Sequence, residues 1–200
     1  MGFMTEHRPH FLANRHDYLP AAGHDALLPG YDLLTRVLGM NPVYDALVSQ
    51  AGLSGGQRVI EIGCGTGNLT VRAKRACPGS EMVATDPDPR ALQRAERKTK
   101  GMAGVQFERA YAQELPFGDG EFDVALSSMM LHHLDEATQV AAIGELFRVL
   151  KPGARAHIVD VRADGLPRLL REAGFNCEIA GSGQLRLAGR VTRFRVTRPD

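Results

Sequence analysis

Three glycines and an acid occur at a spacing that suits the binding of a small charged ligand. A short apolar run containing Glu61 is followed by glycines at alternate positions, Gly63, Gly65 and Gly67. Glycine permits positive φ and removes the Cβ atoms that would hold a ligand away from the backbone. A helix predicted to begin near Asn68 would add free N–H groups and the positive end of its dipole.

A second acid, Asp86, stands at the end of the next predicted strand, 81–86. A carboxylate there can accept hydrogen bonds from two ribose hydroxyls, each contributing roughly 1.5–3 kcal/mol. Asp88 is better placed than Asp86 to cap the following helix, because Pro89 occupies that helix's first turn. The G-x-G-x-G spacing differs from the dinucleotide pattern G-x-G-x-x-G, and no Lys-Ser/Thr follows to make a P-loop.

The elements that must position these residues alternate between strand and helix from residue 58 onward. The expected strands are 58–63, 81–86, 105–110, 122–129, 154–161, 176–181 and 190–198. The expected helices are 68–77, 88–98, 135–150 and 166–174. The third helix is amphipathic, with an apolar stripe of Val140, Ile143, Phe147 and Leu150, and should end at the sequence Lys-Pro-Gly that follows.

Strands separated by helices of about 10–15 residues imply right-handed crossovers and a mostly parallel sheet covered on both faces. The last strand follows a short Gly-containing connection, so it should join antiparallel. We therefore predict a doubly wound α/β domain over residues 51–200. Prolines and short helical patches in residues 1–50 predict an N-terminal helical extension that lies on this domain.

Composition sets few further limits. Apolar residues make up 44% of the chain and charged residues 24%, with a net charge of +1, as in ordinary soluble proteins. The three cysteines, Cys64, Cys77 and Cys177, have no metal or disulfide spacing, which favours a reducing compartment. No apolar run approaches the length needed to cross a membrane, and the N-terminus lacks a signal-peptide core. We expect a cytoplasmic protein without a metal.

Arginines cluster near the C-terminus. The segment 186–198 contains five arginines and no acid. We interpret them as one solvated strand face, with binding to a polyanion as the alternative.

Four segments together resemble a known family in their order and spacing. They are VIEIGCGTGNLT, VATDPD, AQELPFGDGEFDVALSSMMLHHL and LFRVLKPGARAHIVD. They resemble the class I S-adenosylmethionine-dependent methyltransferases, and most of all the family that includes the ubiquinone and menaquinone C-methyltransferases. The resemblance is close over about residues 55–162. It implies a Rossmann-like sheet of seven strands with a reversed last strand, a methyltransferase activity and S-adenosylmethionine as cofactor.

The resemblance also implies roles for individual residues. Glu61 would line the bottom of the methionine pocket, the glycine turn with Cys64 would pass beneath the cofactor, and Asp86 would hold the ribose. The remaining contacts would come from Pro87 beside the adenine, Ala112 and Gln113 at its edge, and Ser127 and Ser128 toward the methionine part. The family often has an acid at position 111, where this chain has Tyr111, a residue that can accept one hydrogen bond or stack.

Methyl transfer from a sulfonium requires mainly that the acceptor is positioned and water excluded. A base is needed only if the acceptor loses a proton near the transition state. The candidates are His132 and His133 after the fourth strand, and His16, Tyr18, His24 and Tyr31 in the N-terminal segment. Tyr31 could close over the cofactor, as tyrosines in this extension do in some relatives. For each candidate a structural or surface role is the alternative.

The connection after the fifth strand is too short to form a lid over the acceptor. The lid should therefore come from residues 1–50 or from a second subunit, in a monomer or homodimer. We expect a small-molecule acceptor and no membrane partner. A nucleic-acid substrate is disfavoured, since Ser-Ser-Met-Met replaces an Asn/Asp-Pro-Pro-Tyr segment after the fourth strand.

Two other functions remain open from the sequence. One is a non-catalytic partner subunit that binds S-adenosylmethionine without transferring its methyl group. The other is a nicotinamide-dependent oxidoreductase on a similar sheet, which the glycine spacing disfavours.

Overall fold

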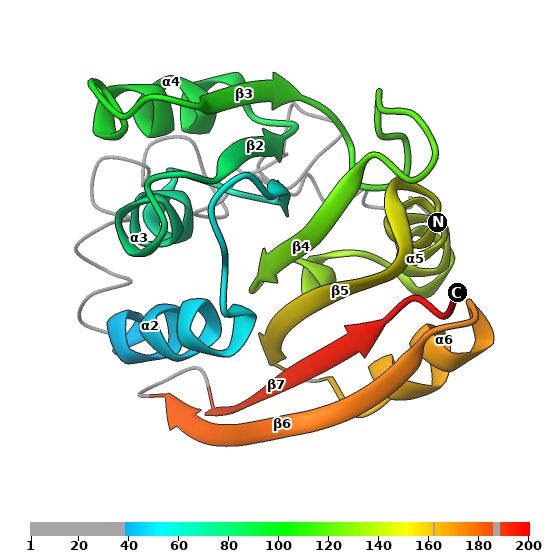
Figure 1. The fold of residues 1–200 in the computed structure, drawn as a ribbon. Coiled ribbons are helices and arrows are strands. Elements are labelled where there is room, and N and C mark those ends of the chain that lie inside the picture. The colour runs from blue at the N-terminus through cyan, green and yellow to red at the C-terminus, as the bar shows by residue number, and fades with distance from the viewer. Residues whose placement is uncertain (1–38, 162, 186–188) are drawn as a thin grey trace, which may run out of the picture.

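One mixed sheet organises the part of the chain that the computed structural model describes, residues 39–161, 163–185 and 189–200. Seven strands lie side by side in the order β3-β2-β1-β4-β5-β7-β6 (Figure 1). The strands are β1 (Arg58–Ile62), β2 (Glu81–Asp86), β3 (Val105–Arg109), β4 (Phe122–Ser128), β5 (Leu150–Val161), β6 (Asn176–Leu185) and β7 (Gly189–Thr197).

The strand directions confirm the predicted fold class. β1 pairs in parallel with β2 and with β4, and the ladder continues in parallel from β2 to β3 and from β4 to β5. β7 lies between β5 and β6 and is antiparallel to both. The connection from Leu185 to Gly189 is too short for a helical crossover, so the chain reverses.

Helices cover both faces of the sheet. Figure 1 shows α2 and α3 on one side and α5 and α6 on the other. The helices are α2 (Met40–Ala51), α3 (Asn68–Ala76), α4 (Pro89–Lys98), a short 3₁₀ helix η3 (Leu131–His133), α5 (Glu136–Val149) and α6 (Leu166–Glu172). Val59 packs in the core under α2 and α3, while the next residue, Ile60, packs in the core under α5 and α6. Among the described helices, none is long and apolar enough to span a membrane.

Two aspartates cap the helices on either side of the central strands. Asp88 accepts a hydrogen bond from Arg90 N at 2.8 Å, and Pro89 takes the first position of α4, as expected. Asp135 accepts from Thr138 N at 2.8 Å and starts α5.

Two members of the predicted apolar stripe of α5, Ile143 and Leu150, are buried as expected, and Val140 is not. Val140 is 52% exposed, and Phe147 is only partly buried. The buried stripe is Ala142, Ile143, Leu146 and Val149. The two stripes share Ile143 and both have helical spacing, and packing against the sheet buries the second one.

The expected stop of this helix at Lys151-Pro152-Gly153 is confirmed, because α5 ends at Val149, but the three residues are part of a strand and not of a connection. β5 begins at Leu150 and runs through these three residues. The pairing register between β4 and β5 shifts between Phe122 and Val124, opposite this stretch. Such an irregularity tolerates a proline, which cannot donate to the ladder.

The C-terminal arginines do not form one solvated face. The Nη1 of Arg198 donates to Phe147 O at 2.9 Å and to Leu150 O at 2.5 Å, and the guanidinium stacks on the Phe147 ring. Arg195 instead forms an ion pair with Glu178 at 3.7 Å. Arg198 follows the end of β7 and contacts the carboxyl end of α5, so it does not share a face with Arg195.

α2 is part of the core although it precedes the predicted boundary at residue 50. It buries Met40, Tyr44, Leu47, Val48 and Ala51 against the sheet. Its Gln50 donates to Phe194 O at 3.0 Å. Residues 1–38, with His16, Tyr18, His24 and Tyr31, lie outside the described residues, so the extension and its role stay predictions.

Candidate active site

The predicted cofactor residues meet at the carboxyl ends of three neighbouring strands. The glycine turn follows β1, Asp86 ends β2 and Ser128 ends β4. Ile62 of β1 is in register with Thr85 of β2 on one side and with β4 on the other. In parallel α/β sheets, ligands bind at this edge.

Backbone hydrogen bonds fold the glycine turn over the end of β2. The N–H groups of Gly63 and Cys64 both donate to Thr85 O at 2.9 Å, and Gly67 N donates to Cys64 O at 2.9 Å. Gly65 N donates to the Asp86 carboxylate at 2.8 Å. The turn and the predicted ribose ligand are therefore one hydrogen-bonded unit.

The structure shows why two of these three positions must be glycine, which the sequence did not reveal. All three have positive φ, between 52° and 77°. A Cβ on Gly63 would overlap Met130 Cγ, and one on Gly67 would lie 2.8 Å from Ala95 Cβ. Packing against the protein itself is therefore sufficient to require glycine at these two positions.

We predict that Gly67→Ala lowers the free energy of unfolding by about 2–5 kcal/mol. Positive φ costs an alanine about 1–2 kcal/mol, and the overlap with Ala95 adds about 1–3 kcal/mol. Gly56→Ala is the matched control, because Gly56 has φ 80° and a Cβ there meets nothing within 4 Å. Denaturant unfolding of both variants measures the difference, and equal losses would rule out the close contact with α4.

Asp86 is held in place by backbone donors. It is 8% exposed, and besides Gly65 N it accepts from Asp88 N at 3.0 Å. Burial raises the pKa of Asp86 to about 6, while the two N–H donors act in the opposite direction. The carboxylate is thus mainly ionised at neutral pH and retains acceptor capacity for hydroxyl groups.

Glu61 lies beneath the turn and is 2% exposed. The Thr70 hydroxyl donates to its Oε2 at 2.5 Å. Burial raises the pKa of Glu61 from 4.5 to about 8, the hydrogen bond from Thr70 lowers it, and the charge of Asp86 raises it further. The carboxyl is therefore mainly protonated at neutral pH.

The raised pKa of Glu61 predicts a pH dependence of stability. Between pH 4.5 and 8 the unfolded chain releases a proton that the folded state keeps. The free energy of unfolding therefore falls as the pH rises through this window. Glu61→Gln should remove the part of this fall that Glu61 causes. Between pH 4.5 and pH 8, the free energy of unfolding of the variant should therefore rise by a few kcal/mol relative to that of the native chain.

Denaturant unfolding at several pH values in this window measures the effect. The exposed Glu96 provides the control Glu96→Gln, which should follow the native pH dependence. A Glu61→Gln variant with an unchanged pH dependence would contradict the prediction.

Two predicted ligands turn out to be engaged with the protein. Cys64 is 6% exposed, packs with Ala84 and Leu92, and directs its thiol at Gly65 O at 3.6 Å. Burial raises the pKa of the Cys64 thiol, which favours the small-side-chain interpretation over a nucleophile. Ser127 Oγ donates to Ile62 O at 3.1 Å.

Ser128 differs from Ser127. Its hydroxyl is buried, yet it has no hydrogen-bond partner in the described structure. A buried hydroxyl without a partner is costly, so this group is available to a bound ligand at the end of β4.

The predicted adenine residues follow the end of β3. Asp86 is in register with Arg109 of β3, which brings the following residues next to the end of β2. Pro87 is half-buried and its carbonyl accepts from Arg109 Nε at 3.0 Å. Ala112 packs against the core, whereas Gln113 is exposed.

Two residues of α5 hold the loop that follows the predicted adenine residues Ala112 and Gln113. The sequence did not indicate this role. Arg148 donates to Glu145 through Nε at 2.7 Å and Nη2 at 2.8 Å, to Phe117 O at 2.7 Å and to Leu115 O at 3.0 Å. Glu145 in turn accepts from Leu115 N at 2.7 Å. The bond to Arg148 lowers the pKa of Glu145. This bidentate pair holds the loop that leads away from the predicted adenine edge.

His132 is paired with an acid that the sequence did not single out. Its Nδ1 lies 2.5 Å from Asp160 Oδ1, and its backbone N–H donates to Asp160 Oδ2 at 3.3 Å. Asp160 is 2% exposed and also accepts from Val161 N at 2.8 Å. The sequence signal for this pair was an acid near the carboxyl end of β5, because β5 lies beside β4 and His132 follows β4.

Among the described residues, His133 has no such acid partner. Its ring centroid lies 3.9 Å from that of His132. Burial lowers the pKa of His133, and the neighbouring His132 lowers it further. Of the two predicted histidines, His132 therefore has the better support for a proton-accepting role.

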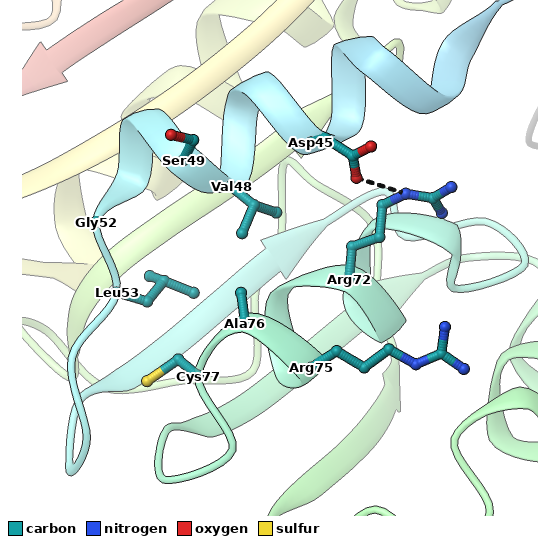
Figure 2. Close-up of a pocket in the computed structure, with 9 residues that line it drawn as sticks. All are labelled: Asp45, Val48, Ser49, Gly52, Leu53, Arg72, Arg75, Ala76 and Cys77. Atoms are coloured by element: carbon teal, nitrogen blue, oxygen red, sulfur yellow. Dashed lines mark hydrogen bonds and ion pairs between the residues drawn. The ribbon is translucent and has the colours of Figure 1, made fainter.

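A separate hollow of about 670 Å³ lies between the carboxyl-terminal parts of α2 and α3 (Figure 2). It is lined by Asp45, Val48, Ser49, Gly52, Leu53, Arg72, Arg75, Ala76 and Cys77. Arg72 and Asp45 form an ion pair at 3.0 Å on its wall. The hollow contains none of the predicted site residues, and the glycine turn lies at the opposite end of α3.

The fold and the arrangement of the predicted site residues together define a class of protein: a Rossmann-like domain whose glycine turn and Asp86 lie together at the carboxyl ends of β1 and β2. Comparison with known proteins agrees. The family profile described as a methyltransferase domain matches residues 59–153. This domain belongs to the class I S-adenosylmethionine-dependent methyltransferases, whose methyl donor is S-adenosylmethionine.

Two curated relatives are similar over about two thirds of this chain. A ubiquinone/menaquinone biosynthesis C-methyltransferase of Desulfotalea psychrophila is 30% identical over 68% of this chain and 55% of its own length. A demethylmenaquinone methyltransferase of Thermus thermophilus is 34% identical over 67% of this chain and 62% of its own. The chain thus spans little more than half the length of these relatives.

Solved structures share the fold. The Haemonchus contortus phosphoethanolamine N-methyltransferase 2, in complex with S-adenosyl-L-methionine, has a TM-score of 0.77 at 14% identity, covering 90% of this chain and 58% of its own. The [4+2]-cyclase SpnF has a TM-score of 0.72 at 18% identity, covering 91% of this chain and 97% of its own. A protein described as a cyclase therefore shares this fold with methyltransferases, and the activity has to be argued from the site.

Proposed function

We propose that this chain transfers a methyl group from S-adenosylmethionine to a small molecule whose methylated atom carries a dissociable proton. One observation carries the proposal. The glycine turn, the Asp86 carboxylate and the His132–Asp160 pair all lie at the carboxyl ends of the adjacent strands β2, β1, β4 and β5. A nucleoside site and a proton acceptor are thereby brought to one edge of the sheet.

The residues present fit the cofactor. Each Asp86 oxygen accepts one backbone N–H, and a carboxylate has about four lone-pair sites, so acceptors remain for the ribose hydroxyls. The buried Ser128 hydroxyl has no partner within the described residues and suits the polar methionine part. Pro87, Ala112 and Gln113 would flank the adenine, beside the loop held by Arg148.

When bound, S-adenosylmethionine supplies a methyl group that is already electrophilic. The contribution of His132 is to take the proton that the acceptor releases. Asp160 accepts a hydrogen bond from the Nδ1–H of His132, which fixes the tautomer in which Nε2 carries the lone pair. The same carboxylate stabilises the imidazolium that forms.

Several features support a small acceptor. β5 ends at Val161 and α6 begins at Leu166, so the connection has little room for a lid. We propose that the lid comes from the N-terminal segment or from a second subunit. The end of β4 carries Ser128 and Met129 where nucleic-acid methyltransferases have Asn/Asp-Pro-Pro-Tyr, which argues against a nucleic-acid acceptor.

The test has two stages. Calorimetry and thermal unfolding with S-adenosylmethionine, and with NAD(H) in parallel, measure cofactor choice. An acceptor screen with radiolabelled S-adenosylmethionine then measures transfer. Stabilisation by NAD(H) alone would favour an oxidoreductase, whereas tight binding of S-adenosylmethionine without transfer to any acceptor would favour a non-catalytic subunit.

A further inference from the structure

α4 joins the two halves of the cofactor site. It begins directly after Asp86, with Asp88 as its cap, and its last turn returns to the glycine turn. There Ala95 packs so closely against Gly67 that a Cβ on this glycine would overlap it. One rigid helix therefore connects the predicted ribose ligand to the turn beneath the cofactor.

Lys98, at the end of α4, is bonded to both sides of Gly67. Its Nζ donates to Thr66 Oγ1 at 2.8 Å and to Asn68 Oδ1 at 2.9 Å. Thr66 is 1% exposed and lies between two glycines of the turn, while Asn68 is the first residue of α3. Hydrogen bonds from a charged donor are about twice as strong as neutral ones.

The glycine turn needs such an external constraint. Glycine loses more conformational freedom on ordering than any other residue, and the turn contains three within five positions. A turn that is loose before binding must be ordered when the cofactor binds, and that cost reduces affinity. Ordering the turn must fix the position of Gly65 N, because this N–H donates to the Asp86 carboxylate.

We propose that Lys98 is a positioning residue for the cofactor, which holds Thr66 and Asn68 so that the glycine turn is preformed. The inference deepens the proposed function and rests on it, since it assumes that S-adenosylmethionine binds at this turn. Lys98 acts through the turn and is not itself a ligand of the cofactor. No local sequence pattern indicates this role, because Lys98 is separated from Thr66 by 32 positions.

The test compares three variants of the full chain. Lys98→Met removes the ammonium and keeps the apolar stem, and Lys98→Arg keeps a charged donor. Lys100→Met is the matched control, because Lys100 is exposed, lies two residues away and carries the same charge. Calorimetry measures Kd for S-adenosylhomocysteine, and amide hydrogen exchange of the cofactor-free protein reports order in the turn.

Lys98→Met should raise Kd about tenfold, a change of about 1.4 kcal/mol. It should also speed exchange at Gly65, Thr66 and Gly67 while exchange in the central strands stays unchanged. Lys98→Arg should restore Kd to within about threefold of the native value, and Lys100→Met should leave it unchanged.

Three results would overturn the inference: an unchanged Kd in Lys98→Met, an equal loss in Lys100→Met, or faster exchange throughout the sheet, which would indicate a general loss of stability. These results leave the proposed function intact as long as the native chain binds S-adenosylhomocysteine. If the native chain does not bind it, the proposed function itself fails.

Discussion

Replacing His132 by alanine should lower kcat by about a hundred- to ten-thousand-fold, the usual contribution of a general base. The affinity for S-adenosylmethionine should stay within about threefold, because the variant leaves the glycine turn and Asp86 in place. The physical reason is the Nδ1 contact with Asp160 at 2.5 Å, which leaves Nε2 as the proton acceptor. Steady-state kinetics with an acceptor from the screen, together with calorimetry of cofactor binding, measure the two effects separately.

Asp160→Asn tests the pair from the other side. An amide keeps the approximate shape but cannot hold the imidazole in the required tautomer or stabilise its charge, so kcat should again fall. Asp160 is a positioning residue. The limb of the pH–rate profile that reports the base should therefore shift in Asp160→Asn, and it should vanish in His132→Ala.

His133→Ala provides the control for the pair. His133 stacks on His132 but has no carboxylate partner in the described part of the chain, so a much smaller loss is expected. The assignment of His132 would be abandoned if kcat in His132→Ala stayed within about threefold of the native value. The role of proton acceptor would be assigned to His133 if kcat fell further in His133→Ala than in His132→Ala.

Asp86→Ala should weaken binding of S-adenosylmethionine by about 2 kcal/mol, or roughly thirtyfold, through loss of hydrogen bonds to a charged group. Part of the loss comes from the turn itself, because the Asp86 carboxylate also holds Gly65 N and Asp88 N. Titration calorimetry at neutral pH measures the change. Asp45→Ala, which removes an exposed carboxylate that pairs with Arg72, serves as the control.

The same carboxylate predicts how affinity depends on pH. Burial raises the pKa of Asp86 to about 6, and the ionised form is the better acceptor for ribose hydroxyls. Affinity in the native chain should therefore fall as the pH is lowered through 6, and Asp86→Asn should lack this fall. Native affinity in Asp86→Ala would remove Asp86 from the site.

Much of the architecture follows from short segments of sequence. Asp88 followed by Pro89 predicted the start of α4 correctly, because a helix cap depends on the side chain and the few N–H groups next to it. The strand–helix alternation and the short connection before β7 predicted the mixed sheet, because connection length limits strand direction. The glycine turn and Asp86 were both predicted to contact the cofactor, and in the structure Gly65 N is bonded to Asp86.

Other features depend on which surfaces meet. The α5 sequence contains two stripes of helical spacing that share Ile143, and only packing on the sheet determines that Leu146 is buried while Val140 is exposed. The Lys-Pro-Gly segment ends α5 as its composition indicates, but only the structure shows that Pro152 lies in β5, at the register shift against β4.

By itself, the sequence determined the class of fold and the residues that end its central strands, and it predicted the edge of the sheet at which the cofactor would bind. The tertiary structure alone decided that Met130 and Ala95 require the glycines, that Asp160 orients His132, and that Lys98 holds the turn. The division has a physical cause. Capping, strand alternation and turn conformation are set by interactions within a few residues, whereas these contacts join positions that are close only after the strands have found their order.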